Sequence, residues 1–165
     1  MTPHNDYDEA IMTLLEGERY FTVGPYYQVY GFESRFSELE DYLAENFLCE
    51  YAERVVRIFL SLMACHDFYI ELAWMNKYNW HLYQKYKRPS TDLSDYSLSE
   101  LGELLKTVLV QGKNHLNLYF IQQKTLVTFE EDFSVVVYTP TDTDFTQLIA
   151  SLAEHESLFV LRYGE

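Results

Sequence analysis

The spacing of apolar residues in this chain changes from helical to strand-like at Gly112, and this change most constrains the fold. Three apolar, β-branched stretches follow it and are separated by tight turns. The stretches are residues 116–123, 125–132 and 133–140, and the turns are Gln123-Lys124 and Glu131-Asp132. Short apolar segments divided by turns are typical of successive β-strands. Thr141 or Asp142 then caps a helix to about Ala153, and residues 158–163 form a last strand. The sequence therefore predicts β-β-β-α-β for the C-terminal part.

The first two-thirds of the chain are predicted to be rich in helices. We expect helices at residues 5–16 and 35–48, short strands at 19–23 and 26–31, and a loop at 88–97. Residues 51–87 contain no Gly or Pro and are apolar around most of the helical circumference until Trp74. Such a stretch predicts a buried central helix, or two helices in series with a bend near His66-Asp67.

A capping box precedes the last of these helices. Ser97 is followed three residues later by Glu100, and the stripe of apolar residues that follows ends at Gly112. A Ser and a Glu at this spacing satisfy each other's backbone N–H groups at a helix N-terminus. Together, the elements predict an α+β fold in a single domain, residues 1–165. The helix-rich N-terminal two-thirds would pack on a small antiparallel or mixed sheet.

Localisation is predicted from what the sequence lacks. The first ten residues have no basic segment and no apolar segment, so we expect no signal peptide. The best apolar run, residues 55–74, is interrupted by charged side chains, which argues against a membrane span. We therefore expect a cytoplasmic protein in which Cys49 and Cys65 are reduced, buried thiols.

The charge of the chain predicts the kind of partner. The formal net charge is −14, and 17% of residues are Phe, Tyr or Trp. Residues 1–50 and 91–165 carry net charges of −9 and −8, while residues 51–90 carry +3. An acidic surface repels nucleic acid and anionic membranes and attracts a basic protein. We expect no direct binding of nucleic acid, although residues 74–88 interleave aromatic and basic side chains as single-strand binders do.

Motifs for catalysis or cofactor binding are absent from the sequence. Cys65, His66 and Asp67 are consecutive, but neighbours on a helix point about 100° apart and so do not face one another. The five histidines show no i,i+3 or i,i+4 pair, and no phosphate-binding glycine motif occurs. We expect no metal, no cofactor and no catalytic residue.

Two acidic clusters with nearby tyrosines are the candidate partner-binding residues. They are Tyr26, Tyr27, Tyr30, Glu33, Glu38, Glu40, Asp41, Tyr42, Glu45, Glu130, Glu131 and Asp132. Each cluster alone is typical of a solvated helix face or turn. Together with the tyrosines, they suit binding, because Tyr gives a large contact area at low entropic cost and carboxylates pair with Arg.

The chain resembles the small acidic bacterial immunity proteins of toxin–immunity systems, including those like contact-dependent inhibition. The resemblance lies in its size, its acidity and the order of its elements, namely TLVTFEEDFSVVVYTP followed by a helix and LFVLRY. It implies a protein that binds a basic toxin domain, such as a nuclease, and occludes its active site. It carries over no individual residues.

Two other functions stay open from the sequence. One is a small enzyme whose site is assembled from scattered residues such as His66, Glu71, Tyr78 and His81. The other is an inhibitor that mimics nucleic acid, which needs carboxylates spaced like phosphates. The sequence leaves open whether the protein is a monomer or a homodimer.

Overall fold

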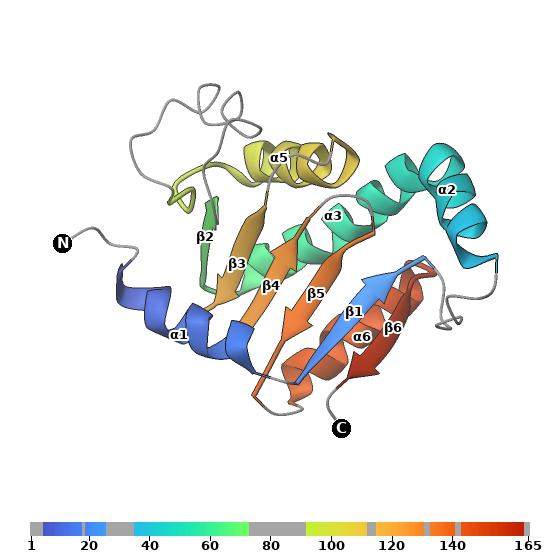
Figure 1. Ribbon diagram of the computed structural model, residues 1–165. Helices are drawn as coiled ribbons and strands as arrows, with labels where there is room; N and C mark the ends of the chain where they lie inside the picture. Colours follow the sequence, from blue (N-terminus) through green and yellow to red (C-terminus); the bar gives the residue numbers. More distant parts are fainter. Residues whose placement is uncertain are drawn as a thin grey trace.

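The computed structural model describes residues 5–17, 19–25, 35–72, 92–111, 115–130, 133–140 and 143–163. In these ranges the chain forms helices and an antiparallel sheet, as the predicted α+β class requires (Figure 1). The helices are α1 (Asn5–Glu16), α2 (Phe36–Asn46), α3 (Leu48–Cys65), α5 (Leu98–Gln111) and α6 (Asp144–His155). The strands are β1 (Tyr20–Gly24), β2 (Phe68–Leu72), β3 (Leu116–Phe120), β4 (Thr125–Phe129), β5 (Val135–Tyr138) and β6 (Phe159–Tyr163).

The sheet has the order β2-β3-β4-β5-β1-β6, and every neighbouring pair is antiparallel. Helices α3, α5 and α6 lie on one side of it, and α1 crosses the other side (Figure 1). Because side chains alternate along a strand, each strand contributes to both sides. We call the side toward α3 the core face and the opposite side the α1 face.

The two faces of the sheet carry different kinds of side chain, which two adjacent rows of paired residues across the strands illustrate. One row on the core face consists of paired apolar residues, all at most 2% exposed. They are Ile70, Leu118, Val127, Val137 and Phe21. The adjacent row on the α1 face is mostly aromatic. It consists of Tyr69, Tyr119, Leu126, Tyr138 and Tyr20.

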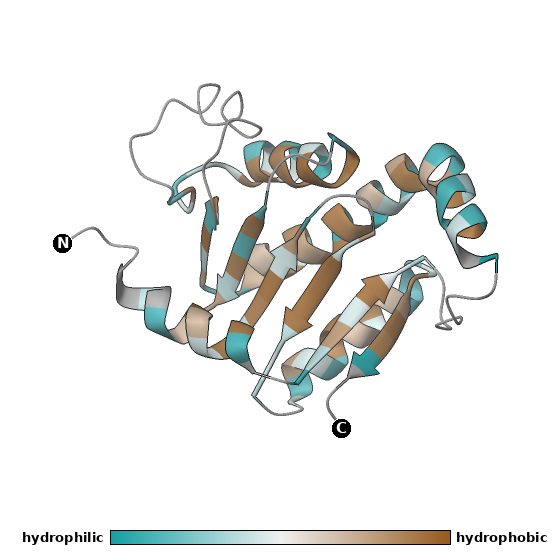
Figure 2. Ribbon diagram, viewed as in Figure 1, coloured by the Kyte–Doolittle hydropathy of each residue, from teal (hydrophilic) through white to brown (hydrophobic). Residues whose placement is uncertain are grey.

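Helix α3 is the centre of the core. Phe59 is fully buried and meets Phe129 edge-on, with ring centroids 5.1 Å apart. Tyr51 is also fully buried, and its hydroxyl donates to the Val23 carbonyl at 2.6 Å. Helix α5 packs closely against α3 at Gly102, where a Cβ atom would lie 2.8 Å from Leu60 Cδ1. Figure 2 shows the middle strands and α3 as largely hydrophobic and α2 as largely hydrophilic.

The predicted central helix over residues 51–87 is wrong beyond Cys65. Helix α3 ends there, His66 has an extended backbone, and the chain turns into β2. Pairing decides this outcome, because β2 lies along β3 and also contacts residues 92–94. The Leu93 N–H donates to the Ile70 carbonyl at 2.8 Å, and the Ile70 N–H donates to Ser94 Oγ at 3.1 Å. The part of the prediction at 73–87 lies outside the described residues.

Several local predictions are confirmed. Ser97 and Glu100 form the capping box, with N–H to side-chain oxygen distances of 2.9 and 3.2 Å. The turn between β3 and β4 contains Lys124 in the left-handed region, at φ 51°. The predicted caps Thr141 and Asp142, the strand at 26–31 and the turn at Glu131-Asp132 lie outside the described residues. Helix α6 is capped instead by Thr143, whose hydroxyl accepts from the Thr146 N–H at 3.3 Å.

The prediction of buried cysteines is wrong. Cys49 and Cys65 are free thiols and both are exposed. In the described part of the chain, no helix combines the length and apolar character needed to cross a membrane.

Candidate functional site

The structure describes half of the predicted partner-binding residues. Glu38, Glu40, Asp41, Tyr42 and Glu45 belong to α2, and Glu130 follows β4. The other predicted residues lie outside the described ranges. They are Tyr26, Tyr27, Tyr30, Glu33, Glu131 and Asp132.

Helix α2 has an exposed surface, which we call the α2 face, made of Glu38, Leu39, Asp41, Tyr42 and Glu45. Tyr42 is 63% exposed, a large value for an aromatic side chain. Glu38 and Glu45 lie four and three residues from Tyr42, so they share its side of the helix, while Asp41 is its neighbour in the sequence. Leu39 is also 37% exposed, and Glu40 is half-buried. The α2 face therefore combines an aromatic ring, an aliphatic side chain and carboxylates.

One base accompanies these carboxylates. Arg35 donates from Nε to Glu38 Oε2 at 2.7 Å, and both side chains are well exposed. Residues 35–46 thus carry four carboxylates and one guanidinium group. An exposed pair of this kind contributes little to stability, so it can exchange for a pair with a partner at small cost.

The position of α2 leaves this surface accessible. The helix lies at the end of the molecule where α3 begins (Figure 1). Phe47 joins the two helices, and its carbonyl accepts from the Tyr51 N–H at 2.8 Å. The Arg54 guanidinium lies 5.3 Å from the centre of the Phe47 ring, which holds the junction in place.

Glu130 belongs to the α1 face of the sheet and not to the α2 face. Its backbone N–H donates to the Ser134 carbonyl at 3.0 Å, which extends the pairing of β4 with β5 by one step. Its Oε1 lies 2.6 Å from His115 Nδ1. Burial and the charge of Glu130 raise the pKa of Tyr138, which lies on the same face of the sheet.

A buried polar cluster on the α1 face escaped the sequence prediction. The Tyr69 hydroxyl donates to Glu71 Oε2 at 2.7 Å, and Asn117 Nδ2 donates to Glu71 Oε1 at 3.3 Å. Glu71 is 8% exposed and Asn117 is 4% exposed. The sequence did contain a signal for this cluster. Each of these polar residues stands between two apolar ones, and such alternation is typical of a β-strand with side chains on two faces.

The two residues of the alternative enzyme site that the structure describes, His66 and Glu71, do not come together. The His66 ring packs against Phe120 and Phe145, on the side of the sheet that α6 covers. Glu71 points to the α1 face, so the sheet separates it from His66. Tyr78 and His81 lie outside the described residues.

Cys65, His66 and Asp67 line one side of an open hollow of about 690 Å³ at the end of α3. They do not form a triad. His66 Nδ1 lies 2.9 Å from the Leu62 carbonyl, which can only accept, so Nδ1 is the donor. Asp67 Oδ2 accepts from Gln122 Nε2 at 3.3 Å. Neither of these hydrogen bonds joins two of the three residues.

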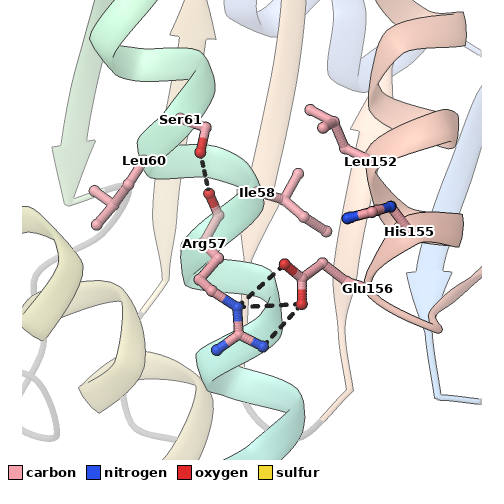
Figure 3. Close-up of a pocket in the computed structure, with 7 residues that line it drawn as sticks. All are labelled: Arg57, Ile58, Leu60, Ser61, Leu152, His155 and Glu156. Carbon is pink, nitrogen blue, oxygen red and sulfur yellow. Dashed lines mark hydrogen bonds and ion pairs between the residues drawn. The ribbon is translucent and has the colours of Figure 1, made fainter.

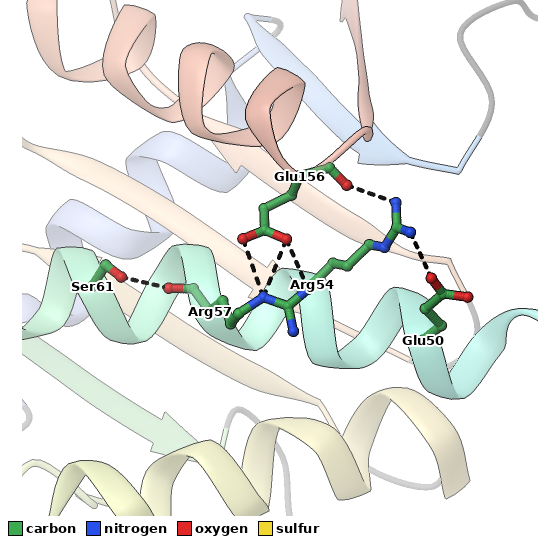
Figure 4. Close-up of polar contacts among 5 residues, drawn as sticks. All are labelled: Glu50, Arg54, Arg57, Ser61 and Glu156. Atoms are coloured by element: carbon green, nitrogen blue, oxygen red, sulfur yellow. Dashed lines mark hydrogen bonds and ion pairs between the residues drawn. The ribbon is translucent and has the colours of Figure 1, made fainter.

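A second hollow of about 370 Å³ lies between α3 and α6 (Figure 3). Ile58 and Leu152 provide its apolar wall, and a charged clamp closes one side. Arg57 Nη2 donates to Glu156 Oε2 at 2.8 Å, and Arg54 Nη1 donates to the Glu156 carbonyl at 2.8 Å (Figure 4). The hydrogen bonds from Arg57 lower the pKa of Glu156 below its ordinary value of 4.5. Because Glu156 follows the last residue of α6, we interpret this clamp as structural.

We expect the two arginines of this clamp to contribute unequally to the free energy of unfolding. Replacing Arg54 by Met is expected to lower the free energy of unfolding by about 1–2 kcal/mol, because a charged donor to the end of α6 is lost. Replacing Arg57 by Met is expected to cost clearly less, since its pair with Glu156 is more exposed. The side chains are 22% and 56% exposed, respectively. Urea unfolding followed by circular dichroism measures both, and a larger loss for Arg57→Met would contradict the interpretation.

No group of three or more His, Cys, Asp or Glu side chains is placed to hold a metal ion within the described ranges. We compared the chain with protein-family models, curated proteins and solved structures, and none of them matched. The α2 face and the α1 face therefore have to be interpreted from their own chemistry.

Proposed function

We propose that this chain is an acidic protein-binding module that binds a basic protein through the α2 face. The observation that carries the proposal is the exposure of Tyr42 among carboxylates. Aromatic side chains dominate the binding energy of protein interfaces, and carboxylates bind arginine with two parallel hydrogen bonds. A net charge of −14 on the whole chain would speed the approach of a basic partner.

The more specific proposal is an immunity protein, encoded in bacteria and acting in the cytoplasm. Its partner would be a toxin domain of the nuclease type, which is basic because it binds a polyanion. The immunity protein would bind this domain in equal proportion and occlude its active site. Long-range attraction would set the rate of association, and buried contacts such as that of Tyr42 would set the rate of dissociation.

Capture of the partner tests this proposal. The full chain is immobilised, exposed to a lysate of its native cells at low salt, and eluted with a salt gradient. We expect a basic protein to elute between about 0.1 and 0.5 M salt, because screening weakens exposed charge pairs in this range. The captured protein should stop growth when expressed alone and should be harmless when expressed with this chain.

Two results would contradict the proposal. One is a captured protein that has no effect on growth, which would remove the immunity function while leaving a binding module. The other is a complex whose formation does not depend on salt, which would remove the role of charge.

A further inference from the structure

The two ends of the sheet differ in how their outer edge is covered. At one end, the Ile70 carbonyl of β2 accepts from the Leu93 N–H at 2.8 Å, and the Ile70 N–H donates to Ser94 Oγ at 3.1 Å. At the other end lies β6 (Figure 1). Among the described residues, β1 is the only strand that pairs with β6. A strand at the end of a sheet presents backbone N–H and C=O groups to which another strand can bind.

The register of the sheet fixes which backbone groups of β6 point outward. In an antiparallel sheet, successive residues of a strand bond alternately to its two neighbours. The Thr139 N–H donates to the Arg19 carbonyl at 3.4 Å, which continues the pairing of β5 with β1. Every second residue of β1, counted from Arg19, therefore bonds to β5, and the residues between them bond to the first, third and fifth residues of β6. The N–H and C=O groups of Val160 and Arg162, the second and fourth residues, consequently point away from β1.

The side chains at this edge differ from the acidic surface of the rest of the chain. Strand β6 has the sequence FVLRY, without a carboxylate, although the whole chain has a net charge of −14. Its one base, Arg162, lies with its guanidinium carbon 5.5 Å from the centre of the Phe21 ring of the same chain. On the α1 face, Phe159 is 38% exposed and Leu161 is half-buried. The residues of β1 and β5 that point to this face are also uncharged. They are Tyr20, Thr22, Val136 and Tyr138.

We propose that β6 pairs with β6 of a second copy of this chain, antiparallel and about a two-fold axis, so that the two sheets become continuous. A two-fold contact brings the same surface of each copy together. On a chain this acidic, such a contact needs a surface without carboxylates, because like charges repel, and β6 provides one. A basic partner, in contrast, would find no carboxylate on β6 to bind. This contact does not depend on the proposed function.

Full overlap of the two strands defines their register. When Leu161, the middle residue of β6, lies opposite Leu161 of the second copy, all five residues of the strand are paired. Val160 then lies opposite Arg162 of the second copy, so the outward backbone groups of the two strands meet. The two Arg162 side chains are not opposite each other, which avoids the cost of opposed like charges. The two Leu161 side chains lie side by side on the α1 face.

Sedimentation velocity of the full chain, at concentrations from about 10 µM to 1 mM, measures this contact. We expect a dimer with a dissociation constant on the order of 100 µM, because a single pair of strands is a small interface. Since both copies are acidic, added salt should screen their repulsion and strengthen the dimer. Added salt should weaken binding of the basic partner, so the two associations respond to salt in opposite ways.

Two variants test the edge. Val160→Pro removes an outward N–H but leaves the pairing with β1, because Pro is tolerated where the N–H of an edge strand faces solvent. It should weaken the dimer at least about ten-fold, through one lost hydrogen bond from each copy. Leu161→Lys should also weaken it, since two ammonium groups would lie opposite each other, and it carries the test if Val160→Pro does not fold. Leu98→Lys is the matched control, because Leu98 is 38% exposed on α5, toward the β2 end of the sheet (Figure 1).

Disulfide formation between copies tests the register. The two native cysteines are first replaced by Ser, because both are exposed. In that chain, Leu161→Cys should form a disulfide-linked dimer with oxidised glutathione. The reason is that the two side chains lie in a non-hydrogen-bonded pair, where Cβ atoms approach closely enough for a disulfide. Val160→Cys should form far less of it, since Val160 lies opposite Arg162 and not opposite itself.

Three results would overturn the inference: a chain that stays monomeric at about 1 mM, a dimer that neither variant weakens, or equal disulfide formation at positions 160 and 161. A monomer whose Val160→Pro variant no longer binds the captured partner would also overturn it, and would assign the edge to that partner. None of these results removes the proposed function, because capture of the partner can be measured at concentrations of the chain well below those at which it would form a dimer.

Discussion

Replacing Phe59 by Ala is expected to lower the free energy of unfolding by about 3–5 kcal/mol, the usual cost of removing a buried phenyl ring. Phe59 is fully buried at the middle of α3 and packs edge-on against Phe129 of β4. The change removes apolar contacts and leaves a cavity between α3 and the sheet. Because folded domains are stable by only about 5–15 kcal/mol, this variant should lose a large part of its stability.

Urea unfolding of the purified chain, followed by circular dichroism, measures this loss. Phe59→Leu is the graded control, because it keeps an apolar side chain and should cost clearly less than the Ala variant. Leu148→Ala is the surface control, since Leu148 is 40% exposed on α6 and should change stability by less than about 1 kcal/mol. A loss below about 1 kcal/mol for Phe59→Ala would contradict the placement of α3 against the sheet.

Elements with local signals were predicted correctly from the sequence. Helix α1 was expected at residues 5–16 and is found at Asn5–Glu16. Helix α5 begins after the predicted capping box, and the strands β3 and β4 lie on either side of the predicted turn. In each case, residues within a few positions of one another decide the conformation, so the sequence contains the necessary information.

Strand β2 was missed because its conformation depends on distant residues. It follows the helical pattern of α3 without an intervening Gly or Pro, so nothing local marks the change. Its hydrogen bonds go to β3 on one side and to residues 92–94 on the other. Pairing across such separations overrides local preference, and a pattern of apolar residues alone does not distinguish a short buried strand from the end of a helix.

The cysteines show why burial cannot be predicted from the adjacent residues in the sequence alone. Cys49 and Cys65 stand beside apolar residues in sequence, yet both are exposed. On a helix, the residue next in sequence points in a different direction, and the side that faces the sheet is fixed by positions three and four residues away. The positions of Leu48, Ala52 and Val55 on the buried side could have predicted the exposure of Cys49.

The candidate sites also differ in whether the sequence could have predicted them. The α2 face was predictable, because its carboxylates and Tyr42 lie on one short helix with clear periodicity. The buried polar cluster on the α1 face was not, because Glu71 and Asn117 are 46 positions apart and meet only when β2 pairs with β3. Glu130 was singled out for its charge, and its position on the α1 face, opposite Ser134, follows from the pairing of β4 with β5.

Replacing Glu38, Glu40, Asp41 and Glu45 by Gln is expected to slow association with the captured partner about ten-fold at low salt. Electrostatic attraction between complementary surfaces raises association rates by 10-fold to 1,000-fold, and screening removes most of this gain. The difference between this variant and the natural chain should therefore shrink as salt is added. Stopped-flow measurement of the association rate at several salt concentrations tests this dependence.

The control must separate the α2 face from net charge alone. A second variant replaces four exposed carboxylates on other helices, Glu9, Glu16, Glu103 and Glu154, by Gln. Both variants change the net charge from −14 to −10. If α2 is the contact surface, the control should slow association far less, and Tyr42→Ala in the natural chain should raise the dissociation rate instead. Equal slowing by the two variants would mean that the acidity of the whole chain attracts the partner, and that α2 is not where it binds.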